Sequence, residues 1–163
     1  VTNFTTGGTA QSGAVVLRPE YRQALQDLDG FSHVWIISHL HLNSGWKLSV
    51  RPPRGPKNRR RGLFATRAPH RPNQMGLSAV ELQSVDVDAG KLHVRGLDLL
   101  DGTPVLDLKP YVPYCDAFTS ARAGWIDELD STPNSPDRLD YWPPPPHLLP
   151  DDADTDDADK GTS

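Results

Sequence analysis

Short stretches rich in β-branched and aromatic residues, separated by turns that contain glycine or proline, occupy most of the chain between positions 13 and 108. Phe31–Leu42 is the longest, and Leu77–Val87 and Lys91–Leu97 alternate apolar and polar residues on either side of Asp88-Ala89-Gly90. Alternation with a period of two predicts strands with one buried face, and a short turn that contains glycine predicts a hairpin. Further strands are predicted at 13–17, 63–66 and 104–108.

Helical spacing of apolar residues occurs in one segment, which follows Pro19 and runs through Tyr21, Leu25 and Leu28 to Gly30. Proline suits the first turn of a helix, and glycine suits its end. One helix among several strands argues against repeated βαβ units and therefore against a Rossmann fold. We predict a mainly β fold, a small antiparallel barrel or curled sheet with one or two short helices.

The composition changes near position 131. Pro143–Pro146 are consecutive prolines, and the tail from Asp151 to Ser163 holds six aspartates and one lysine. That tail accounts for −5 of a net charge of −4, which leaves +1 for residues 1–150. Segments of this composition bury too little apolar surface to fold alone. We therefore expect a folded domain at 1–130, with 1–12 as a loop, and a disordered tail at 131–163.

Three features indicate the cellular compartment. The single cysteine, Cys115, excludes an internal disulfide and fits a reducing cytoplasm. No apolar run approaches the roughly 18 residues that a membrane-spanning helix requires. Residues 1–13 lack the basic stretch and apolar core of a secretory signal. We expect a cytoplasmic protein without membrane contact.

A basic segment interrupts the predicted strands. From Lys47 to Arg71 the chain has nine lysines and arginines and no acidic residue. Such a local positive field suits a polyanion such as RNA, although a solvated loop can have the same composition. Its densest part is Arg59-Arg60-Arg61, and Trp46 nearby could stack on a base.

Histidines follow the period of the longest predicted strand. In a strand at 31–42, side chains alternate, so one face would carry His33, Trp35, Ile37, His39 and His41. His39 and His41 could together hold a metal ion, but no third ligand is evident from the spacing. Partly buried histidines with ordinary hydrogen bonds, or histidines that contact an organic ligand, explain the pattern as well. We expect no metal site.

A turn stiffened by prolines carries cationic side chains. Within Gly62–Ser78 two prolines fix the backbone, which presents Arg67, Arg71 and Asn73 on a rigid support. The planar guanidinium of arginine can donate two hydrogen bonds to a carboxylate or phosphate. A rigid surface turn with solvated arginines is the alternative.

Two aspartates follow the strand predicted at 91–97. Asp101 precedes Gly102, which is ordinary turn chemistry. Asp98 lies between apolar residues, so its burial would require compensating hydrogen bonds, and it is the stronger functional candidate. The next segment, Asp107–Asp116, combines charges with tyrosines. It could contribute to catalysis or only form an ion pair that fixes the turn.

Six sequence blocks occur in the order found in one known family. They are Phe31-Ser-His-Val-Trp35, Val50-Arg-Pro-Pro-Arg54, Gly62-Leu-Phe-Ala-Thr-Arg67, Arg71-Pro-Asn73 with Gly76-Leu-Ser78, Asp98-Leu-Leu-Asp-Gly-Thr-Pro104 and Asp107-Leu-Lys-Pro-Tyr111. Six blocks in sequence are far more specific than any one of them. The chain, over about residues 13–125, resembles the TrmO, or TsaA-like, family.

The resemblance implies a small antiparallel β-barrel that binds S-adenosylmethionine (SAM) without a Rossmann domain and forms a homodimer. Members of the family methylate N6 of threonylcarbamoyladenosine at position 37 of tRNA. By this resemblance we expect SAM contacts from Leu40, His41, Arg67, Leu77, Arg95, Gly96, Leu97 and Asp98. Asp98 is the first choice for the catalytic base, followed by His41 and Asp101. The tRNA anticodon loop is expected to contact Arg59, Arg60, Arg61, Arg71, Asn73, Lys109 and Tyr111.

The chain departs from the family pattern in three places. Asn3–Gly7 stands where the family has a Pro-Arg-Gln loop after an additional strand, and Gln74-Met75 replaces a Pro-Ile pair. Many bacterial members also have a second domain where this chain has its proline-rich segment. These departures leave two other functions open. One is a SAM-binding barrel that methylates a different substrate, and the other is a catalytically silent RNA-binding or SAM-sensing module.

Overall fold

A computed structural model describes residues 12–53, 56 and 58–130 of the chain, and the expected tail at 131–163 lies outside them. The chain divides into two compact units at Asp116 and Ala117. The described part of the second unit contains the short helix α2 (Trp125–Asp130), in which the Asp127 carboxylate accepts a hydrogen bond from the N–H of Ala123 just before the helix. No helix in the described ranges has the length and apolar character that crossing a bilayer requires.

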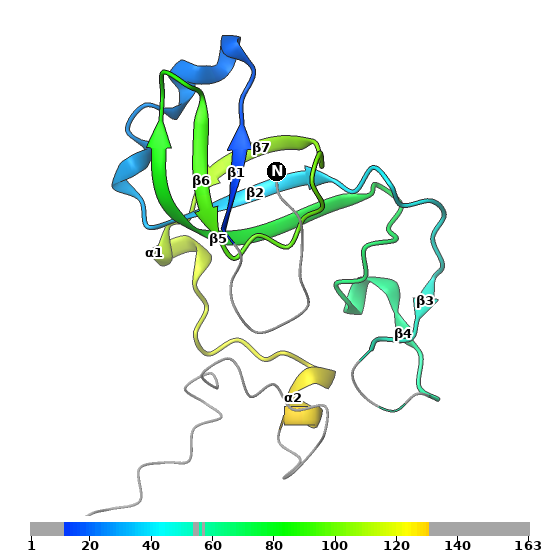
Figure 1. The fold of residues 1–163 in the computed structure, drawn as a ribbon. Coiled ribbons are helices and arrows are strands. Elements are labelled where there is room, and N and C mark those ends of the chain that lie inside the picture. The colour runs from blue at the N-terminus through cyan, green and yellow to red at the C-terminus, as the bar shows by residue number, and fades with distance from the viewer. Residues whose placement is uncertain (1–11, 54–55, 57, 131–163) are drawn as a thin grey trace, which may run out of the picture. The chain divides into compact units, whose positions relative to one another are not determined.

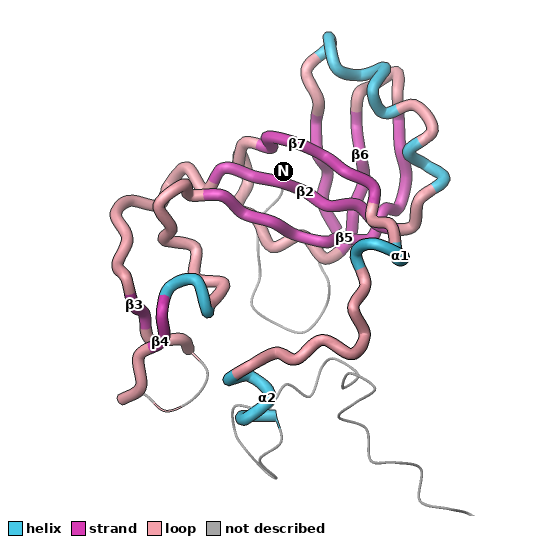
Figure 2. Tube along the Cα trace, turned by 180° about the vertical axis from the view of Figure 1, so that it is seen from behind, coloured by secondary structure: helices cyan, strands magenta, loops and turns pink. Residues whose placement is uncertain are grey.

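Five strands of the first unit form one antiparallel sheet in the order β1-β6-β5-β2-β7. Their bounds are β1 Ser12–Val16, β2 His33–His39, β5 Met75–Asp86, β6 Lys91–Arg95 and β7 Val105–Pro110. The long strand β5 bends, so β1 and β6 run across the direction of β2 and β7 (Figure 1, Figure 2). A register shift between Leu82 and Ser84 interrupts the pairing of β5 with β6, and such bulges bend a strand.

The shorter elements lie between the strands. β3 (Ser49–Val50) and β4 (Arg61–Gly62) form a separate two-stranded sheet in the connection from β2 to β5. Three 3₁₀ helices and one short α-helix complete the first unit: η1 Pro19–Leu25, η2 Leu28–Gly30, η3 Leu63–Ala65 and α1 Pro113–Asp116.

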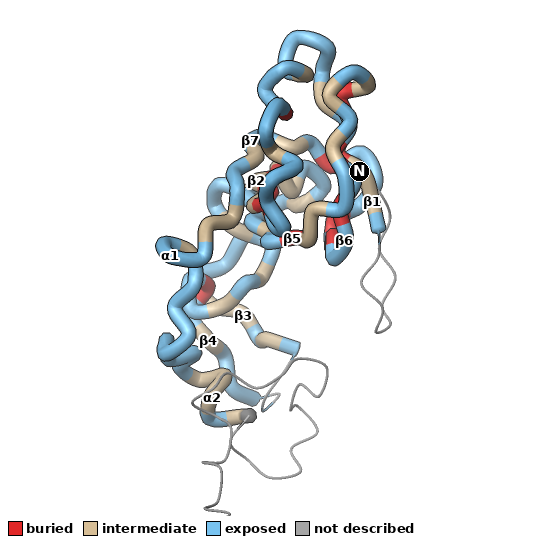
Figure 3. Tube along the Cα trace, turned by 90° about the vertical axis from the view of Figure 1, so that its left-hand side faces the viewer, coloured by how far each residue is buried: buried red, intermediate tan, exposed pale blue. Residues whose placement is uncertain are grey.

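One face of the five-stranded sheet forms the core. Along β2, Val34, Ile36 and Ser38 are buried, whereas the residues between them are half-buried or exposed. The other fully buried core residues are Val15, Val80, Leu92 and Val94, with Leu97 and Leu99 from the loop after β6. Figure 3 shows these buried positions gathered within the sheet. The alternation expected for His33, Trp35, Ile37 and His39 is therefore confirmed, and His41 lies just beyond the strand.

Three expectations about the elements are wrong in part. The segment after Pro19 is not one α-helix, because Asp27 adopts a left-handed backbone (φ 62°) that separates η1 from η2. Residues 63–66 form η3 rather than a strand, with the Thr66 N–H bonded to the Leu63 oxygen at 3.1 Å. The expected barrel is not closed among the described residues, because β1 and β7 each pair with one neighbour only.

The alternation along β2 predicts a large difference between neighbouring substitutions. Ile36→Ala removes a fully buried side chain and should lower the free energy of unfolding by about 2–5 kcal/mol. Ile37→Ala, on the half-exposed face, is the matched control and should cost clearly less. Urea unfolding followed by circular dichroism measures both, and equal losses would contradict the assignment of the two faces.

Candidate functional site

The turn between η3 and β5 is organised around Arg71. Its Nη1 donates to the carbonyl oxygen of Thr66 at 3.0 Å and also reaches those of Leu63 and Ala68 at 3.5 and 3.4 Å. The guanidinium lies 5.4 Å from the ring centroid of Phe64, which is 79% exposed. Arg71 therefore holds the turn together, and only part of its guanidinium remains for a contact with RNA.

Arg67 of the same turn is tied to β5. Its Nη2 donates to the carbonyl oxygen of Leu77 at 2.8 Å, and the side chain is exposed. This hydrogen bond orients the guanidinium and uses one of its N–H groups. The other N–H groups make no hydrogen bond to that carbonyl oxygen. Leu77 itself is 50% exposed, so an apolar surface lies beside the cation.

Asp98 contacts Ser78, the residue of β5 that follows Leu77. The Ser78 hydroxyl donates to Asp98 Oδ1 at 2.8 Å. Gly96 makes the backbone reversal after β6 with φ 88°, and buried Leu97 and Leu99 anchor the loop on either side of Asp98. The apolar residues on either side of Asp98 suggested that its side chain would be buried, but it is exposed.

Two loops that are distant in sequence therefore converge on adjacent residues of one strand. Arg67 contacts Leu77, and Asp98 contacts Ser78. A cation and an anion are in this way fixed at the start of β5. The sequence predicts that the arginine turn and the aspartate-bearing loop meet to form a pocket. The structure brings both segments to neighbouring residues of β5, and we treat this place as the candidate site.

The end of β2 borders the same turn. The Leu40 N–H donates to the Gln74 oxygen at 2.8 Å, and Gln74 Nε2 donates to the Asn43 oxygen at 2.7 Å. Gln74 adopts a left-handed backbone, with φ 49°, which is uncommon for a residue with a side chain. These bonds hold Leu40 and His41 next to the arginine turn. His41 is exposed.

Gly76 of β5 lies directly opposite Ser38 of β2. A Cβ atom on Gly76 would lie 2.5 Å from Ser38 Oγ and 3.2 Å from Leu40 Cδ2. Ser38 is fully buried, and its hydroxyl has no hydrogen-bond partner within the described part of the chain. Glycine is therefore required at position 76 by space rather than by backbone angle.

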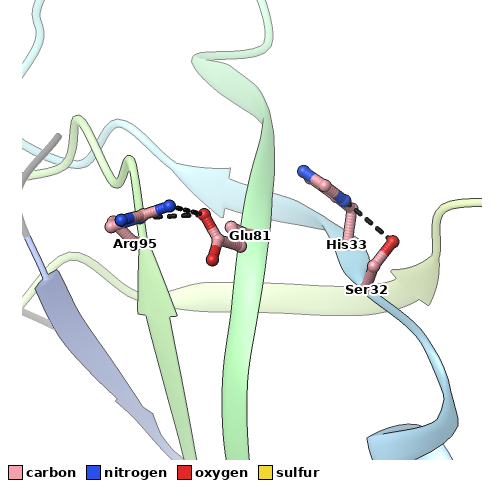
Figure 4. Close-up of polar contacts among 4 residues, drawn as sticks. All are labelled: Ser32, His33, Glu81 and Arg95. Atoms are coloured by element: carbon pink, nitrogen blue, oxygen red, sulfur yellow. Dashed lines mark hydrogen bonds and ion pairs between the residues drawn. The ribbon is translucent and has the colours of Figure 1, made fainter.

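Arg95, another expected SAM contact, is the last residue of β6. Arg95 forms an ion pair with Glu81 on the neighbouring strand, and its Nε lies 2.8 Å from Glu81 Oε2 (Figure 4). On the same face His33 Nδ1 lies 3.0 Å from the Ser32 hydroxyl. Arg95 is already compensated by a carboxylate, unlike Arg67, whose only hydrogen bond among the described residues is to a carbonyl oxygen.

Lys109 and Tyr111 lie at β7 and its exit. Lys109 Nζ is 2.8 Å from Asp107 Oδ2, and this hydrogen bond with Lys109 holds the pKa of Asp107 below its ordinary value. Tyr111 packs against Trp35 with ring centroids 5.6 Å apart. The ion pair considered for this segment is therefore present. Lys109 is on β7 and Tyr111 directly follows this strand, so neither residue is on the arginine turn.

The arginines of the basic segment flank the two-stranded sheet. Arg60 donates to the Ser49 hydroxyl at 2.9 Å and to the Ser49 carbonyl oxygen, which ties the segment to β3. Arg59 is exposed and Arg61 is part of β4. Asn73 is exposed in the arginine turn, and Asp101 is exposed in the turn after Asp98.

Among the described residues, neither a group of metal ligands nor the cavity beside β7 coincides with this site. Within residues 12–53, 56 and 58–130, no three His, Cys, Asp or Glu side chains are grouped to bind a metal ion, and the rings of His39 and His41 are 6.4 Å apart. A cavity of about 910 Å³ lies between β1, η1 and β7, and none of the residues expected to contact SAM lines it.

Sequence reasoning missed two residues of the site. Ser78 orients Asp98, and Gln74 connects the arginine turn to β2. Ser78 was within a recognised block but carried no distinctive chemistry. The feature that distinguishes Gln74 is its left-handed backbone. The sequence does not reveal this conformation, so Gln74 could not be identified from it.

The bonds of Arg71 predict a structural role that lysine cannot replace. Arg71→Lys should lower the free energy of unfolding by about 1–3 kcal/mol, because one ammonium group cannot reach the same carbonyl oxygens. Arg59→Lys, on an exposed arginine, is the control and should have little effect. Thermal or urea unfolding measures the difference, and unchanged stability in Arg71→Lys would contradict this role.

Comparisons with known proteins agree with the arrangement of these blocks. The family model for the N-terminal domain of tRNA-methyltransferase O matches residues 5–117. A tRNA (adenine(37)-N6)-methyltransferase from Eikenella corrodens is 41% identical over 134 residues, which are 73% of this chain and 72% of the relative. The Escherichia coli K12 protein of that name is 43% identical over 120 residues, 70% of this chain and 51% of the relative.

Solved structures give the same result. A crystal structure of TrmO from Pseudomonas aeruginosa is 44% identical, with a TM-score of 0.56 over 69% of this chain and 47% of that one. A relative from the same species, described in its name as a candidate S-adenosylmethionine-dependent methyltransferase, is 51% identical over 122 residues, 72% of this chain and 52% of the relative. The chain thus spans about half the length of several curated relatives. It belongs to the TrmO family of tRNA-methyltransferase O N-terminal domains.

Proposed function

We propose that the chain acts as a SAM-dependent methyltransferase that methylates N6 of threonylcarbamoyladenosine at position 37 of tRNA. Membership of the TrmO family and relatives named tRNA (adenine(37)-N6)-methyltransferases support this activity. The structural observation that carries the proposal is the attachment of Arg67 and Asp98 to consecutive residues of β5.

The side chains of the candidate site fit SAM in charge. SAM carries a carboxylate, an ammonium group and a sulfonium centre, and when bound it supplies an electrophilic methyl group. The Arg67 guanidinium can bind the carboxylate, and the Asp98 carboxylate attracts a cationic group. Met75 and Leu77, each 50% exposed, offer apolar contact for the adenosyl part. We place SAM between the arginine turn and the loop of Asp98, with Leu40 and His41 at its border.

Asp98 is also the proposed proton acceptor. The exocyclic amine of adenine is a weak nucleophile because its lone pair is conjugated with the ring, and it must lose a proton during or after attack. Ser78 fixes Oδ1 of Asp98, whereas Oδ2 makes no hydrogen bond to another described residue. His41, at the end of β2, and Asp101, in the same loop, are the alternatives. Holding the amine in line with the methyl group can itself contribute several kcal/mol, roughly 7–11 in model systems.

The basic segment is the proposed surface for the anticodon loop. Arg59, Arg60 and Arg61 can bind phosphates, and Trp46, which is 50% exposed, can stack on an unpaired base. Arg71, Asn73, Lys109 and Tyr111 remain proposed contacts. By family resemblance we also propose a cytoplasmic homodimer, in which a partner could cover exposed apolar residues such as Leu42 and Leu48.

A methyl-transfer assay tests the activity and its alternatives. With labelled SAM and total tRNA, label should enter tRNA that carries the threonylcarbamoyl group and should be absent from tRNA without it. Asp98→Asn keeps the shape of the side chain but cannot accept the proton, so it should lower the rate by roughly 10²–10⁴-fold. SAM binding without tRNA labelling would favour a different substrate, and no SAM binding would favour a silent module.

Salt dependence tests the tRNA surface. Changing Arg59, Arg60 and Arg61 together to Ala should weaken tRNA binding at low salt and reduce the slope of log K against log salt by about 2–3, because three phosphate contacts are lost. Changing Arg18, Lys91 and Arg122 to Ala removes the same charge elsewhere and serves as the control. Filter binding at several salt concentrations gives both slopes. Identical slopes for the two triple variants would reject this surface.

A further inference from the structure

Phe64 is a large apolar side chain exposed to solvent at the centre of η3. It is 79% exposed, whereas Leu63 beside it is 3% exposed and anchors the helix. The exposure of Phe64 alone indicates little, because single apolar side chains are common on protein surfaces. What distinguishes Phe64 is how its ring is held and which charges surround it.

The ring of Phe64 is held by a cation that is itself fixed. The Arg71 guanidinium lies over the ring, 5.4 Å from its centroid, and donates to the Thr66 carbonyl oxygen at 3.0 Å. The Thr66 hydroxyl closes the same turn, because it donates to the Leu63 oxygen at 2.8 Å and accepts from the Ala68 N–H at 3.3 Å. A ring that is already immobilised loses little freedom when a ligand binds to its open surface. The ring of Phe64 is therefore a preformed flat surface.

The charges around the ring have one sign. Phe64 lies in the basic segment from Lys47 to Arg71, which has nine lysines and arginines and no acidic residue. Arg61 precedes the ring in β4, and Arg67 follows it in the arginine turn. A flat ring among cations fits a ligand that combines a flat face with negative charge. An unpaired nucleotide of RNA has both, because its base can stack and its phosphate is anionic.

Two other ligands fit this ring less well. SAM has one negative and two positive groups, so its net charge is positive and the basic segment does not attract it. A second copy of the chain that docked symmetrically on the ring would bring its own basic segment against the first. Like charges placed together oppose such an association. RNA is therefore the partner that the charge of this surface favours.

We propose that Phe64 is a stacking platform for an unpaired base of the RNA substrate, with Arg71 behind the ring. This inference rests on the proposed function in one respect, namely that the substrate is RNA. Every base has a flat face, so the platform accepts any base and adds affinity without selecting a sequence. The phosphates would be held by Arg59, Arg60 and Arg61, and Phe64 would hold a base.

Binding of two RNAs to the full chain tests the proposal. An RNA stem-loop and a closed duplex both carry phosphates, but only the stem-loop offers unpaired bases. Phe64→Ala should weaken binding of the stem-loop by about 5- to 150-fold and leave binding of the duplex unchanged. The slope of log K against log salt should not change, because no phosphate contact is lost.

Leu48→Ala is the matched control for this measurement. Leu48 belongs to the same basic segment and is 81% exposed, but its side chain has no ring. The substitution should change binding of neither RNA. Equal weakening by the two variants, equal weakening for the two RNAs, or no binding of the stem-loop to the unchanged protein would overturn the proposal.

Two further variants separate stacking from simple apolar contact. Phe64→Tyr keeps an aromatic ring and should retain binding of the stem-loop, whereas Phe64→Leu keeps an apolar side chain without a ring and should lose nearly as much as Phe64→Ala. The ring is mostly exposed, so urea unfolding should show nearly the same stability for all these variants. Normal stem-loop binding by Phe64→Leu, or a loss of SAM affinity alone in Phe64→Ala, would reject the stacking role.

The result is separable from that of the proposed function. Methyl transfer from labelled SAM to tRNA by the unchanged protein tests the activity, whereas stem-loop binding requires no SAM. Methyl transfer together with normal stem-loop binding by Phe64→Ala would reject the stacking role and leave the activity. The expected loss of stem-loop binding in a chain that transfers no methyl group would support the stacking role and reject the activity.

Discussion

The attachment of two loops to the start of β5 is the constraint on which the site depends. The Leu77 carbonyl receives the Arg67 guanidinium, and the Ser78 hydroxyl holds the Asp98 carboxylate. Paired strands are a rigid support for a site. Leu77 and Ser78 of β5 pair with Ile37 and Ile36 of β2, whereas β6 pairs with β5 only from Glu81 onward. The two opposite charges, which come from distant parts of the sequence, are therefore attached to the part of β5 that β2 holds. The proposed binding of a ligand that carries both signs of charge rests on this arrangement.

The arginines of this chain fall into different roles despite their closeness in sequence. Arg71 binds carbonyl oxygens of its own turn, Arg60 is tied to Ser49, and Arg95 is neutralised by Glu81. Arg67 differs from these arginines, because its hydrogen bond to the Leu77 carbonyl oxygen places its guanidinium beside the half-exposed side chain of Leu77. Composition alone treats Arg60, Arg67 and Arg71 as one basic region. The hydrogen bonds divide them into residues that build the protein and residues that are directed outward.

Periodicity predicted the strands well because one face of the sheet is buried. β2, β5, β6 and β7 follow the alternation of the sequence to within a few residues, and the convergence of Arg67 with Asp98 was expected from the blocks that contain them. Residues 63–66 were misjudged because a short apolar stretch fits a strand and a 3₁₀ turn equally well. The open edges at β1 and β7 could not be predicted, because a local sequence pattern does not record which strands pair. The exposure of Asp98 could not be predicted either, because the apolar residues on both sides of it are buried.

The close contact at Gly76 limits how this family member can change. A methyl group at position 76 would meet the Ser38 hydroxyl and the Leu40 side chain, so it requires these two side chains, or β2 itself, to shift. Any shift of β2 would carry Leu40 and the Gln74 contact with it. Substitutions that alter ligand preference are therefore expected at the exposed positions around the site, while this crossing point tolerates only coordinated changes on both strands.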